Sequence, residues 1–236
     1  MHAFDSFDGG LLVDKPSGMT SHDVVDAIRK KFKFKKVGHC GTLDPAATGL
    51  LVIVLGKATR LSEKLMGDDK VYEGQIKLGE TTSSYDAEGE LLTTAAVPPL
   101  TVEALNDSAQ SFVGDLLQVP PMVSAIKQHG VPLYKLARKG VEVERKPRLI
   151  HVYQFRFLSY EAPVGAFRVA CTKGTYIRSL AHDLGQKLGC GAHLCALRRL
   201  ACGRFDIADA APLDSLLHLS LPELEQRVLP YLKLAA

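Results

Sequence analysis

The chain has 236 residues, of which 46% are hydrophobic, so it is long enough to bury one sizeable core or two small ones. No apolar run approaches the about 20 residues that a membrane helix needs, and the N-terminus carries Asp5 and Asp8 rather than the basic start of a secretory signal. Five cysteines without a Cys-x-x-Cys pair argue against a disulfide framework and fit a reducing compartment. We therefore expect a cytoplasmic protein that does not associate with a membrane.

The first part of the chain shows two predicted strands and two predicted helices. We expect a short strand over residues 11–14, followed by a helix that begins near Ser21 as its N-cap. The apolar face of this helix is expected to consist of Val24, Val25, Ile28 and Phe32. Residues 50–55 form an uninterrupted apolar run bounded by glycines, which predicts a strand buried on both faces. A second helix is expected over residues 58–66, with Gly67 at its C-terminal end.

The rest of the chain mixes strands and helices without regular alternation. Strands are expected over residues 70–78, 150–160 and 164–172, with a turn over residues 86–89. Helices are expected over residues 101–112, capped by Thr101, over residues 175–189, ended by Gly189, over residues 213–219 and from residue 222. Because no internal repeat or linker divides the sequence, we expect a single domain over residues 1–236. The irregular order of elements favours the α+β class with a mixed, largely antiparallel sheet and flanking helices.

A glycine-rich loop precedes the buried strand and contains a single carboxylate, Asp44. Its sequence is Gly38-His39-Cys40-Gly41-Thr42-Leu43-Asp44-Pro45-Ala46-Ala47-Thr48-Gly49. A loop anchored to the middle of a sheet is a common place for reactive side chains. An aspartate before a proline is also common in ordinary turns. The spacing alone leaves both interpretations open.

The net charge of +3 is modest, but the basic residues are unevenly distributed. Residues 204–236 carry a net −2, so residues 1–203 carry +5. Two basic stretches contain Arg29, Lys30, Lys31, Lys33, Lys35 and Lys36, and Lys127, Lys135, Arg138 and Lys139. Such runs are often solvated faces. Two runs on either side of the Asp44 loop in the sequence suit a phosphate backbone better.

Other chemistries fit the sequence less well. The spacing of Cys190, His193, Cys195 and Cys202 matches no common zinc module, so we expect no metal site. A thiol-hydrolase set of His39, Cys40 and Asp44 is disfavoured because adjacent residues on one tight loop seldom reach hydrogen-bonding geometry. Neither a phosphate-binding Gly-x-x-x-x-Gly-Lys loop nor a dinucleotide-binding glycine motif is present in the sequence.

The Asp44 loop closely resembles the signature of pseudouridine synthases of the TruB type. Five other segments match the same family in the same order. These are Leu11-Leu12-Val13-Asp14-Lys15-Pro16-Ser17-Gly18-Met19-Thr20-Ser21, Asp69-Lys70-Val71-Tyr72, Gln118-Val119-Pro120-Pro121-Met122-Val123-Ser124-Ala125-Ile126-Lys127, Cys171-Thr172-Lys173-Gly174-Thr175-Tyr176-Ile177-Arg178-Ser179-Leu180 and Leu197-Arg198-Arg199-Leu200. The resemblance covers roughly residues 10 to 208.

The resemblance implies a role for each matching residue. Asp44 corresponds to the family's nucleophilic aspartate, Arg178 to the arginine that pairs with it, and Tyr72 to the tyrosine that stacks on the target uracil. The residues implied in the substrate pocket are His39, Tyr176 and Leu197, in addition to Tyr72. Lys15 and Pro16 are implied to support the catalytic loop.

The resemblance also implies a fold and a reaction. The fold is that of the pseudouridine synthases, a long curved sheet with a central RNA-binding cleft, in which residues of about 120–148 form an RNA-gripping insertion. The reaction is the isomerisation of uridine to pseudouridine in tRNA, at the uridine of the T-loop numbered 55 in tRNA convention. It requires no cofactor, and we expect a monomer that needs no protein partner. The alternatives are a non-catalytic protein that binds or folds tRNA, and a synthase that acts on another RNA.

Two features depart from the family pattern. Many members carry a further RNA-binding domain after the Leu-Arg-Arg segment, whereas here residues of about 209–236 suggest only a short helical stub. Ser83 stands where relatives commonly have an aspartate, so the hydrogen bonding of that loop is expected to differ.

Overall fold

The computed structural model describes residues 7–235 apart from residues 125, 129 and 138, and these residues form two compact units. Unit 1 comprises residues 7–72 and 197–235, and unit 2 comprises residues 73–196. The strands β4 (Lys70–Leu78) and β12 (Ala192–Cys202) contribute residues to both units.

The further elements of unit 1 are β1 (Gly9–Lys15), α1 (Ser21–Phe32), β2 (Val37–Cys40), β3 (Thr48–Leu55), the 3-10 helix η1 (Gly56–Leu61), α2 (Ser62–Met66), β13 (Phe205–Asp206), the 3-10 helix η2 (Ile207–Asp209), β14 (Ala211–Pro212), α6 (Leu213–His218), α7 (Leu221–Glu225), β15 (Leu229–Pro230) and α8 (Tyr231–Ala235). Those of unit 2 are β5 (Glu80–Thr82), β6 (Leu91–Thr94), α3 (Val102–Gln110), β7 (Gly114–Gln118), β8 (Lys127–Gln128), β9 (Val131–Pro132), α4 (Leu133–Ala137), β10 (Arg148–Glu161), β11 (Val164–Cys171) and α5 (Ile177–Leu188).

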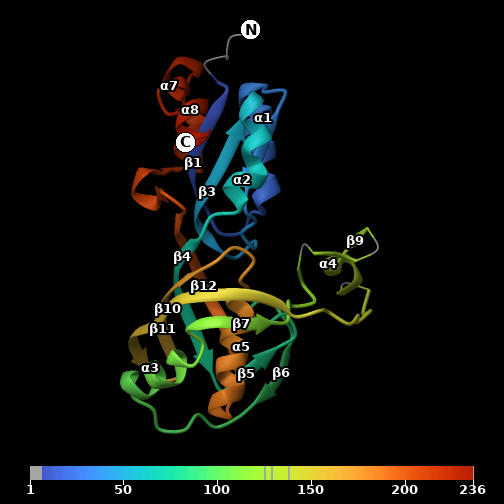
Figure 1. Ribbon diagram of the computed structural model, residues 1–236, viewed down its shortest axis with the longest axis vertical. Helices are drawn as coiled ribbons and strands as arrows, with labels where there is room; N and C mark the ends of the chain where they lie inside the picture. Colours follow the sequence, from blue (N-terminus) through green and yellow to red (C-terminus); the bar gives the residue numbers. More distant parts are fainter. Residues whose placement is uncertain (1–6, 125, 129, 138, 236) are drawn as a thin grey trace. The chain divides into compact units, whose positions relative to one another are not determined.

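Strand β3 lies in the middle of the unit 1 sheet (Figure 1). It pairs antiparallel with β1 and with β2, and its first residues pair parallel with β12. All residues of β3 after Thr48 are buried, which confirms the prediction of a strand covered on both faces. The strand is thus a rigid base for the loop that precedes it.

Both ends of helix α1 are defined by local features of the sequence. The side chain of Thr20 accepts a hydrogen bond from the backbone N–H of Asp23, and the Asp23 carboxylate accepts one from the Thr20 backbone N–H. The prediction that Ser21 is the N-cap was wrong, because Thr20 precedes it and has the extended backbone of a cap. Lys33 ends the helix in the left-handed conformation.

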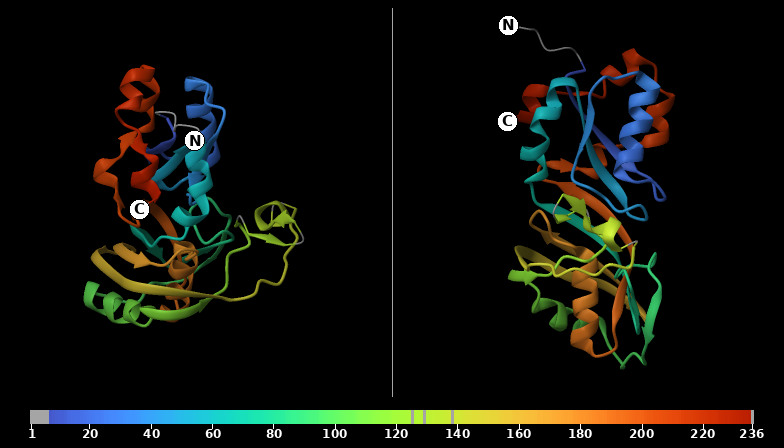
Figure 2. Two further views of the ribbon diagram at one scale, coloured as in Figure 1. Left: turned by 45° about the horizontal axis from the view of Figure 1, so that its top comes forward. Right: turned by 90° about the vertical axis from the view of Figure 1, so that its right-hand side faces the viewer.

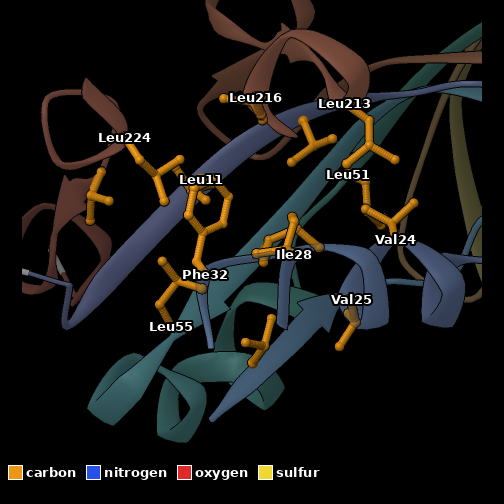
Figure 3. Close-up of a cluster of buried hydrophobic side chains, with 14 residues drawn as sticks. Leu11, Val24, Val25, Ile28, Phe32, Leu51, Leu55, Leu213, Leu216 and Leu224 are labelled. Carbon is orange, nitrogen blue, oxygen red and sulfur yellow. The ribbon is translucent and has the colours of Figure 1, made fainter. Parts of the chain in front are cut away.

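The apolar face of α1 closes one core of unit 1 (Figure 3). Val24, Ile28 and Phe32 of the helix pack against Leu11 of β1 and Leu51 of β3. Leu213, Leu216 and Leu224 of the C-terminal helices belong to the same cluster. The C-terminal segment is therefore part of the core that supports the sheet.

The helix predicted over residues 58–66 is divided into two short helices. The first is η1 and the second is α2. Gly56 has a positive φ of 56°, and a side chain there would overlap the carboxylate of Asp8. Gly67 follows α2 in a right-handed conformation rather than in the left-handed one that glycine usually supplies at a helix end.

The sheet of unit 2 has the order β12, β4, β11, β10, β7, and β10 pairs antiparallel with both of its neighbours. Thr101 caps α3, and Gly189 ends α5 with a positive φ, as predicted. Helix α3 (green) packs beside β10 (yellow), and α5 (orange) lies beside α3 (Figure 2). Phe155, Phe157 and Phe167 form the aromatic part of this core.

The segment between β7 and β10 contains the hairpin of β8 and β9 and the short helix α4, and it projects from the unit 2 sheet (Figure 1). This is the segment predicted to grip RNA. Its described backbone is tied to itself, for example by the N–H of Tyr134, which donates to the carbonyl of Ser124 at 3.0 Å.

The predicted α+β class with a mixed, largely antiparallel sheet is confirmed. The central RNA cleft stays a prediction, as does the single domain over residues 1–236. Across the described part of the chain, no helix is both long and apolar enough to span a membrane.

Candidate active site

The loop predicted over residues 38–49 is shorter in the structure, because residues 38–40 belong to β2 and residues 48–49 to β3. The Asp44 loop therefore spans residues 41–47 and connects these two strands of unit 1. It leaves β2 through Gly41, whose φ of 88° favours glycine. The backbone carbonyl of Asp44 accepts a hydrogen bond from the N–H of Ala47 at 3.1 Å, so the chain turns directly after Asp44. The side chain of Asp44 is half-buried. The loop therefore has both turn geometry and a sheltered carboxylate.

Lys15, at the end of β1, is fully buried and supports the loop from below. Its ammonium group donates to the backbone carbonyls of Pro16 at 2.8 Å, Met19 at 2.6 Å and Pro45 at 3.1 Å. The carbonyl of Pro45 also accepts the N–H of Gly18 at 2.9 Å. A buried ammonium group is stable only when its donors are satisfied, so Lys15 fixes the segment that follows Asp44. Its predicted support of the loop is consistent with these contacts, and Pro16 lies exposed beside it.

Ser21 connects the start of α1 to the residue before Asp44. Its hydroxyl accepts the N–H of Leu43 at 2.8 Å and lies 3.2 Å from the Leu43 carbonyl, to which it donates. The side chain of Leu43 is buried. Ser21 thus acts as a tie for the loop instead of the helix cap that the sequence suggested.

Arg199, on β12, is the third support and was not assigned a role from the sequence. It is 1% exposed, although its neighbour Arg198 is half-exposed and pairs with Asp14 at 2.6 Å. The guanidinium of Arg199 donates to the carbonyls of Leu50 at 2.7 Å, Gly41 at 3.1 Å and Thr42 at 3.5 Å. A planar group with several donors suits this task, because it can bind several carbonyls at once.

Gly49 lets β3 approach β12 closely enough for this arrangement. Its φ is 100°, and a Cβ atom there would lie 2.3 Å from the backbone carbonyl oxygen of Arg199. A side chain at this position would therefore push the two strands apart. Gly49 is therefore required for the close packing of β3 against β12, which places Arg199 beside the Asp44 loop.

His39 and Cys40 precede the loop on β2. Burial lowers the pKa of His39, and the positive charge of Arg199 lowers it further. The Nδ1 of His39 is buried and has no hydrogen-bond partner within the described residues. Burial raises the pKa of the Cys40 thiol to about 12, so this thiol stays protonated near neutral pH. That protonation state disfavours the thiol-hydrolase alternative.

Two further predicted pocket residues belong to unit 1. Tyr72 is buried on β4, and Leu197 is half-buried on β12. The carbonyl of Leu197 accepts the Thr48 hydroxyl at 3.5 Å, at the start of β3. Both residues therefore lie on strands of the sheet rather than on loops.

Arg178 lies in the first turn of α5 in unit 2 and is 3% exposed, so it is not an ordinary surface charge of a helix. Its guanidinium donates to the carbonyls of Ser84 at 3.1 Å and Val123 at 2.8 Å. It also forms an ion pair with Asp86 at 3.5 Å. These contacts hold the guanidinium in one orientation.

Asp86 is a residue that sequence reasoning missed. Its carboxylate accepts the Ser84 hydroxyl and the N–H of Glu88 at 3.1 Å, in addition to its ion pair with Arg178. Its own carbonyl accepts the Thr82 hydroxyl at 2.6 Å. The sequence predicted only a turn over residues 86–89 and gave no partner for Asp86.

Tyr176 is the residue before α5, and its backbone is fixed by Gln118. The N–H of Tyr176 donates to the side-chain carbonyl of Gln118 at 2.8 Å, and the Gln118 amide donates to the Tyr176 carbonyl at 3.1 Å. Gln118 is buried at the end of β7. This reciprocal pair of hydrogen bonds fixes the backbone directly before α5 and thereby the position of Arg178 in its first turn.

The two predicted basic stretches are mostly exposed where they are described. In unit 1 the side chains of Lys30, Lys31, Lys33, Lys35 and Lys36 are exposed, and Arg29 is half-buried. Arg29 donates to the carbonyl of Val37 at 3.2 Å, so it is partly structural. In unit 2 Lys135 and Lys139 are exposed, whereas Arg138 and the side chain of Lys127 lie outside the described structure.

The predicted site residues are thus divided between the two units. Asp44, His39, Tyr72, Leu197, Lys15 and Pro16 belong to unit 1, and Tyr176 and Arg178 belong to unit 2. The predicted pairing of Asp44 with Arg178 stays a prediction. Among the described residues, no group of three or more histidine, cysteine or acidic side chains is arranged to hold a metal ion.

Comparisons with known proteins show the family of this chain. The family model of the N-terminal domain of the TruB family pseudouridylate synthases matches residues 29–177, and that of the tRNA pseudouridylate synthase B C-terminal domain matches residues 178–233. The chain is 56% identical to tRNA pseudouridine synthase B of Opitutus terrae over 94% of this chain and 92% of the relative. It is 52% identical to that of Syntrophotalea carbinolica over 91% of this chain and 70% of the relative.

A solved structure has the same fold. A chain in the crystal structure of a Cbf5–Nop10–Gar1 complex superimposes with a TM-score of 0.77 at 30% identity. The match covers 97% of this chain and 62% of that chain, so the present chain spans about three fifths of its length. Because a family model covers most of the sequence and close relatives cover nearly all of it, the chain belongs to the TruB family of pseudouridylate synthases.

Proposed function

We propose that this chain isomerises uridine to pseudouridine in tRNA and that Asp44 is the catalytic residue. The observation that carries the proposal is the Asp44 loop, which carries the family signature and is held by Lys15, Ser21 and Arg199. Fixed support of a half-buried carboxylate is what a nucleophile or a base in a water-poor site requires. The names of the close relatives support the same activity.

The reaction can be written with side chains alone. The bond between uracil N1 and ribose C1′ breaks, the uracil leaves as an anion, and the base rotates within the site. A bond then forms between C5 and C1′, the hydrogen on C5 leaves as a proton, and N1 gains a proton. The isomerisation needs neither an electron donor nor a donated group. An ionised carboxylate suffices, as nucleophile or as base.

We assign each remaining site residue either to the ionised state of the Asp44 carboxylate or to the binding of the uracil. We assign Arg178 to keep the Asp44 carboxylate ionised, because a nearby cation offsets the cost of removing a carboxylate from water. Asp86 is a positioning residue that orients Arg178 through their ion pair. We assign Tyr72 to stack on the uracil, and the pocket residues His39, Tyr176 and Leu197 to surround it. A flipped base regains on the order of 1–3 kcal/mol by such stacking.

The target that we propose is the T-loop uridine at position 55 of tRNA. The base must leave its stack to reach Asp44, which costs a few kcal/mol. The exposed lysines of residues 30–36 and of residues 120–148 supply contacts to the phosphate backbone. We expect the enzyme to act in the cytoplasm, where its tRNA substrate is found, as a monomer without a protein partner.

The test is the release of tritium from tRNA transcript labelled at C5 of uridine. The wild-type protein is compared with Asp44→Ala and with the control Asp107→Ala, which changes an exposed aspartate of α3. A second transcript carries cytidine in place of the T-loop uridine. We expect release with the wild type and the control, loss of release with Asp44→Ala, and loss of release with the second transcript. tRNA binding is measured in parallel and is expected to persist in Asp44→Ala.

Each departure from this result has a distinct meaning. Release at the wild-type rate by Asp44→Ala would refute the role of Asp44. Release that persists with the second transcript would keep the reaction but move its target to another uridine. No release with any transcript, together with tight tRNA binding, would support a protein that binds or folds tRNA without modifying it.

A further inference from the structure

On one edge of strand β1 in unit 1, the pairing with neighbouring strands is interrupted, which leaves an opening. One edge of β1 pairs with β3 from Gly10 to Lys15. On the other edge, β15 pairs with Gly9 and Gly10, and β14 pairs with Val13 and Asp14. Leu11 and Leu12, between these two short partners, are paired with β3 alone in the described register. The opening is therefore two residues long.

The antiparallel geometry of β1 and β3 determines what this opening contains. In such a pair, alternate residues direct both their N–H and their C=O toward the partner, and the residues between them direct both groups away from it. The pairings of Gly10 with Leu229 and of Val13 with Ala211 make Leu12 the residue that faces away from β3. Its carbonyl is used in the parallel pairing with Ala211, because Pro212 has no N–H, so its N–H is the group left at the open edge. The side chains of Leu11 and Leu12 enter two different core clusters, so the opening lies at the sheet edge between them (Figure 3 shows Leu11).

A cavity of about 540 Å³ lies at this opening. Its apolar wall consists of Leu11 and Leu12 of β1, Ala211 of β14, Leu229 of β15, Phe205 and Leu216. Pockets that bind small organic ligands usually have volumes of about 300–1,000 Å³ and mainly apolar walls with a few polar groups. Neither the size nor the lining of this cavity is explained by the residues assigned to the isomerisation.

The charged residues that line the cavity carry a net charge of opposite sign to that of the C-terminal segment from which they come. Residues 204–236 contain three basic and five acidic residues, and all three basic ones, Arg204, Arg227 and Lys233, line the cavity. Of the acidic residues only Asp209 does so. A segment with a net negative charge thus presents a net positive charge here, which favours an anionic ligand.

Arg204 is held at the cavity by two contacts. Its guanidinium lies over the ring of Phe205 at 5.2 Å, and it donates a hydrogen bond to the carbonyl of Lys233. A guanidinium placed in this way keeps further donors for a phosphate. The cavity therefore combines a positive rim, an apolar wall and one backbone donor at the strand edge.

We propose that this cavity binds one nucleoside phosphate. The phosphate contacts Arg204, Arg227 and Lys233, the base lies against the apolar wall, and an acceptor atom on the edge of the base binds the N–H of Leu12. An extended peptide added to β1 is a poorer occupant, because β14 and β15 block the edge on either side of the opening. A base is compact, and its edge carries acceptor atoms that a single backbone N–H can bind.

This chemistry has two sources, a free nucleotide and a nucleotide of the RNA substrate. The RNA source rests on the proposed function, whereas the free nucleotide does not. If the RNA is the source, the C-terminal segment gives the enzyme a second contact with tRNA, in addition to the exposed lysines and the Asp44 site.

The test uses the full chain and three variants. Arg227→Gln with Lys233→Gln removes two charges from the rim, and Ala211→Leu narrows the cavity without changing its charge. Arg60→Gln is the control, because Arg60 is an exposed cation of η1 in the same unit. Equilibrium titrations with uridine monophosphate, adenosine monophosphate, uridine and inorganic phosphate probe the free ligand, and titrations with tRNA transcript at several salt concentrations probe the RNA. Thermal unfolding checks that each variant is folded.

We expect at least one nucleoside monophosphate to bind more tightly than uridine or inorganic phosphate. Its Kd should rise about tenfold in the double variant and in Ala211→Leu, and stay unchanged in Arg60→Gln. A parallel rise of the tRNA Kd, with a salt slope smaller by about 1–2, identifies the RNA as the source. An unchanged tRNA Kd identifies the free nucleotide.

The proposal is overturned if neither nucleoside monophosphate binds more tightly than inorganic phosphate. It is also overturned if the folded double variant and folded Ala211→Leu bind nucleoside monophosphate and tRNA with the wild-type Kd values. Tritium release by the wild-type protein is recorded in the same series. Its absence would refute the proposed function and leave the result on nucleotide binding intact, so the two failures are distinguishable.

Discussion

Two groups of basic side chains in unit 1 consist of similar residues in opposite surroundings. Lys15 and Arg199 are 0% and 1% exposed, and they donate to backbone carbonyls on both sides of Asp44. The lysines of residues 30–36 are exposed to solvent. Buried cations with satisfied donors hold the chain in one shape, whereas exposed cations on flexible side chains can meet a phosphate. Charge alone does not distinguish these roles, and burial does.

Adjacent residues show the same difference. Arg198 is half-exposed and pairs with the carboxylate of Asp14, whereas Arg199 is buried against the Asp44 loop. Successive side chains of a strand point to opposite faces, so neighbouring arginines have different partners. The comparison predicts that loss of a buried cation alters stability and turnover, and that loss of exposed cations alters RNA binding.

The largest expected effect is on stability. Arg199→Met leaves the carbonyls of Gly41, Thr42 and Leu50 without their donor, which should lower the free energy of unfolding by about 3 kcal/mol or more. Urea unfolding measures the change. The control Arg60→Met alters an exposed cation and should change stability by less than about 0.5 kcal/mol. Equal effects of the two variants would remove the distinction between buried and exposed cations.

The next effect concerns the buried cation of unit 2. Asp86→Asn weakens the ion pair that orients Arg178, and we expect single-turnover tritium release to fall about tenfold to hundredfold, while the Kd for tRNA changes little. Glu88→Gln, an exposed change two residues away, is the matched control. A change in the Kd without a change in the single-turnover rate would show that Asp86 does not act through the reacting carboxylate.

A smaller effect is expected from the exposed group. Replacing Lys30, Lys31 and Lys33 with glutamine should raise the KM for tRNA about fivefold and leave kcat nearly unchanged. Each lost phosphate contact should also reduce the salt slope of binding by about 0.7–0.9. Binding titrations at several salt concentrations measure both quantities. An unchanged salt slope would assign these lysines to a merely solvated face.

The smallest effect is a pH dependence. Burial lowers the pKa of His39 in the folded chain, so the folded state resists protonation of this ring. The stability that depends on neutral His39 is fully present above the unfolded pKa near 6.5 and decreases as the pH falls below it. His39→Phe should reduce the loss of stability between pH 7 and pH 5, whereas the exposed His218→Phe serves as the control. Identical pH profiles of wild type and His39→Phe would contradict this.

The sequence predicted the features that depend on local pattern. The apolar run of β3, the apolar face of α1 and the caps of α3 and α5 were all visible, because their signals lie within one element. The family signature also singled out Asp44, whose catalytic role stays a proposal. In these elements, residues close together in the sequence determine the structure.

The supports of the loop were not predictable in the same way. Ser21 bonds to Leu43, 22 positions away, and Arg199 reaches Gly41, 158 positions away. Asp86 and Arg178 meet across 92 positions, as their residue numbers show. A serine near a helix start and an arginine beside another arginine have ordinary local explanations. Only the pairing of β12 with β3 and the turn after Ser84 bring these side chains to their partners.

The most direct test of the account is the single-turnover rate of tritium release at saturating tRNA, measured for wild type, Arg199→Met and the variant with Lys30, Lys31 and Lys33 changed to glutamine. We predict that Arg199→Met, under conditions in which it is folded and binds tRNA, loses most of the rate because the Asp44 loop is no longer fixed. The lysine variant should keep the wild-type rate once tRNA is saturating. A wild-type rate in Arg199→Met, or a lost rate in the lysine variant, would contradict the claim that buried cations serve the chemistry and exposed cations serve the RNA.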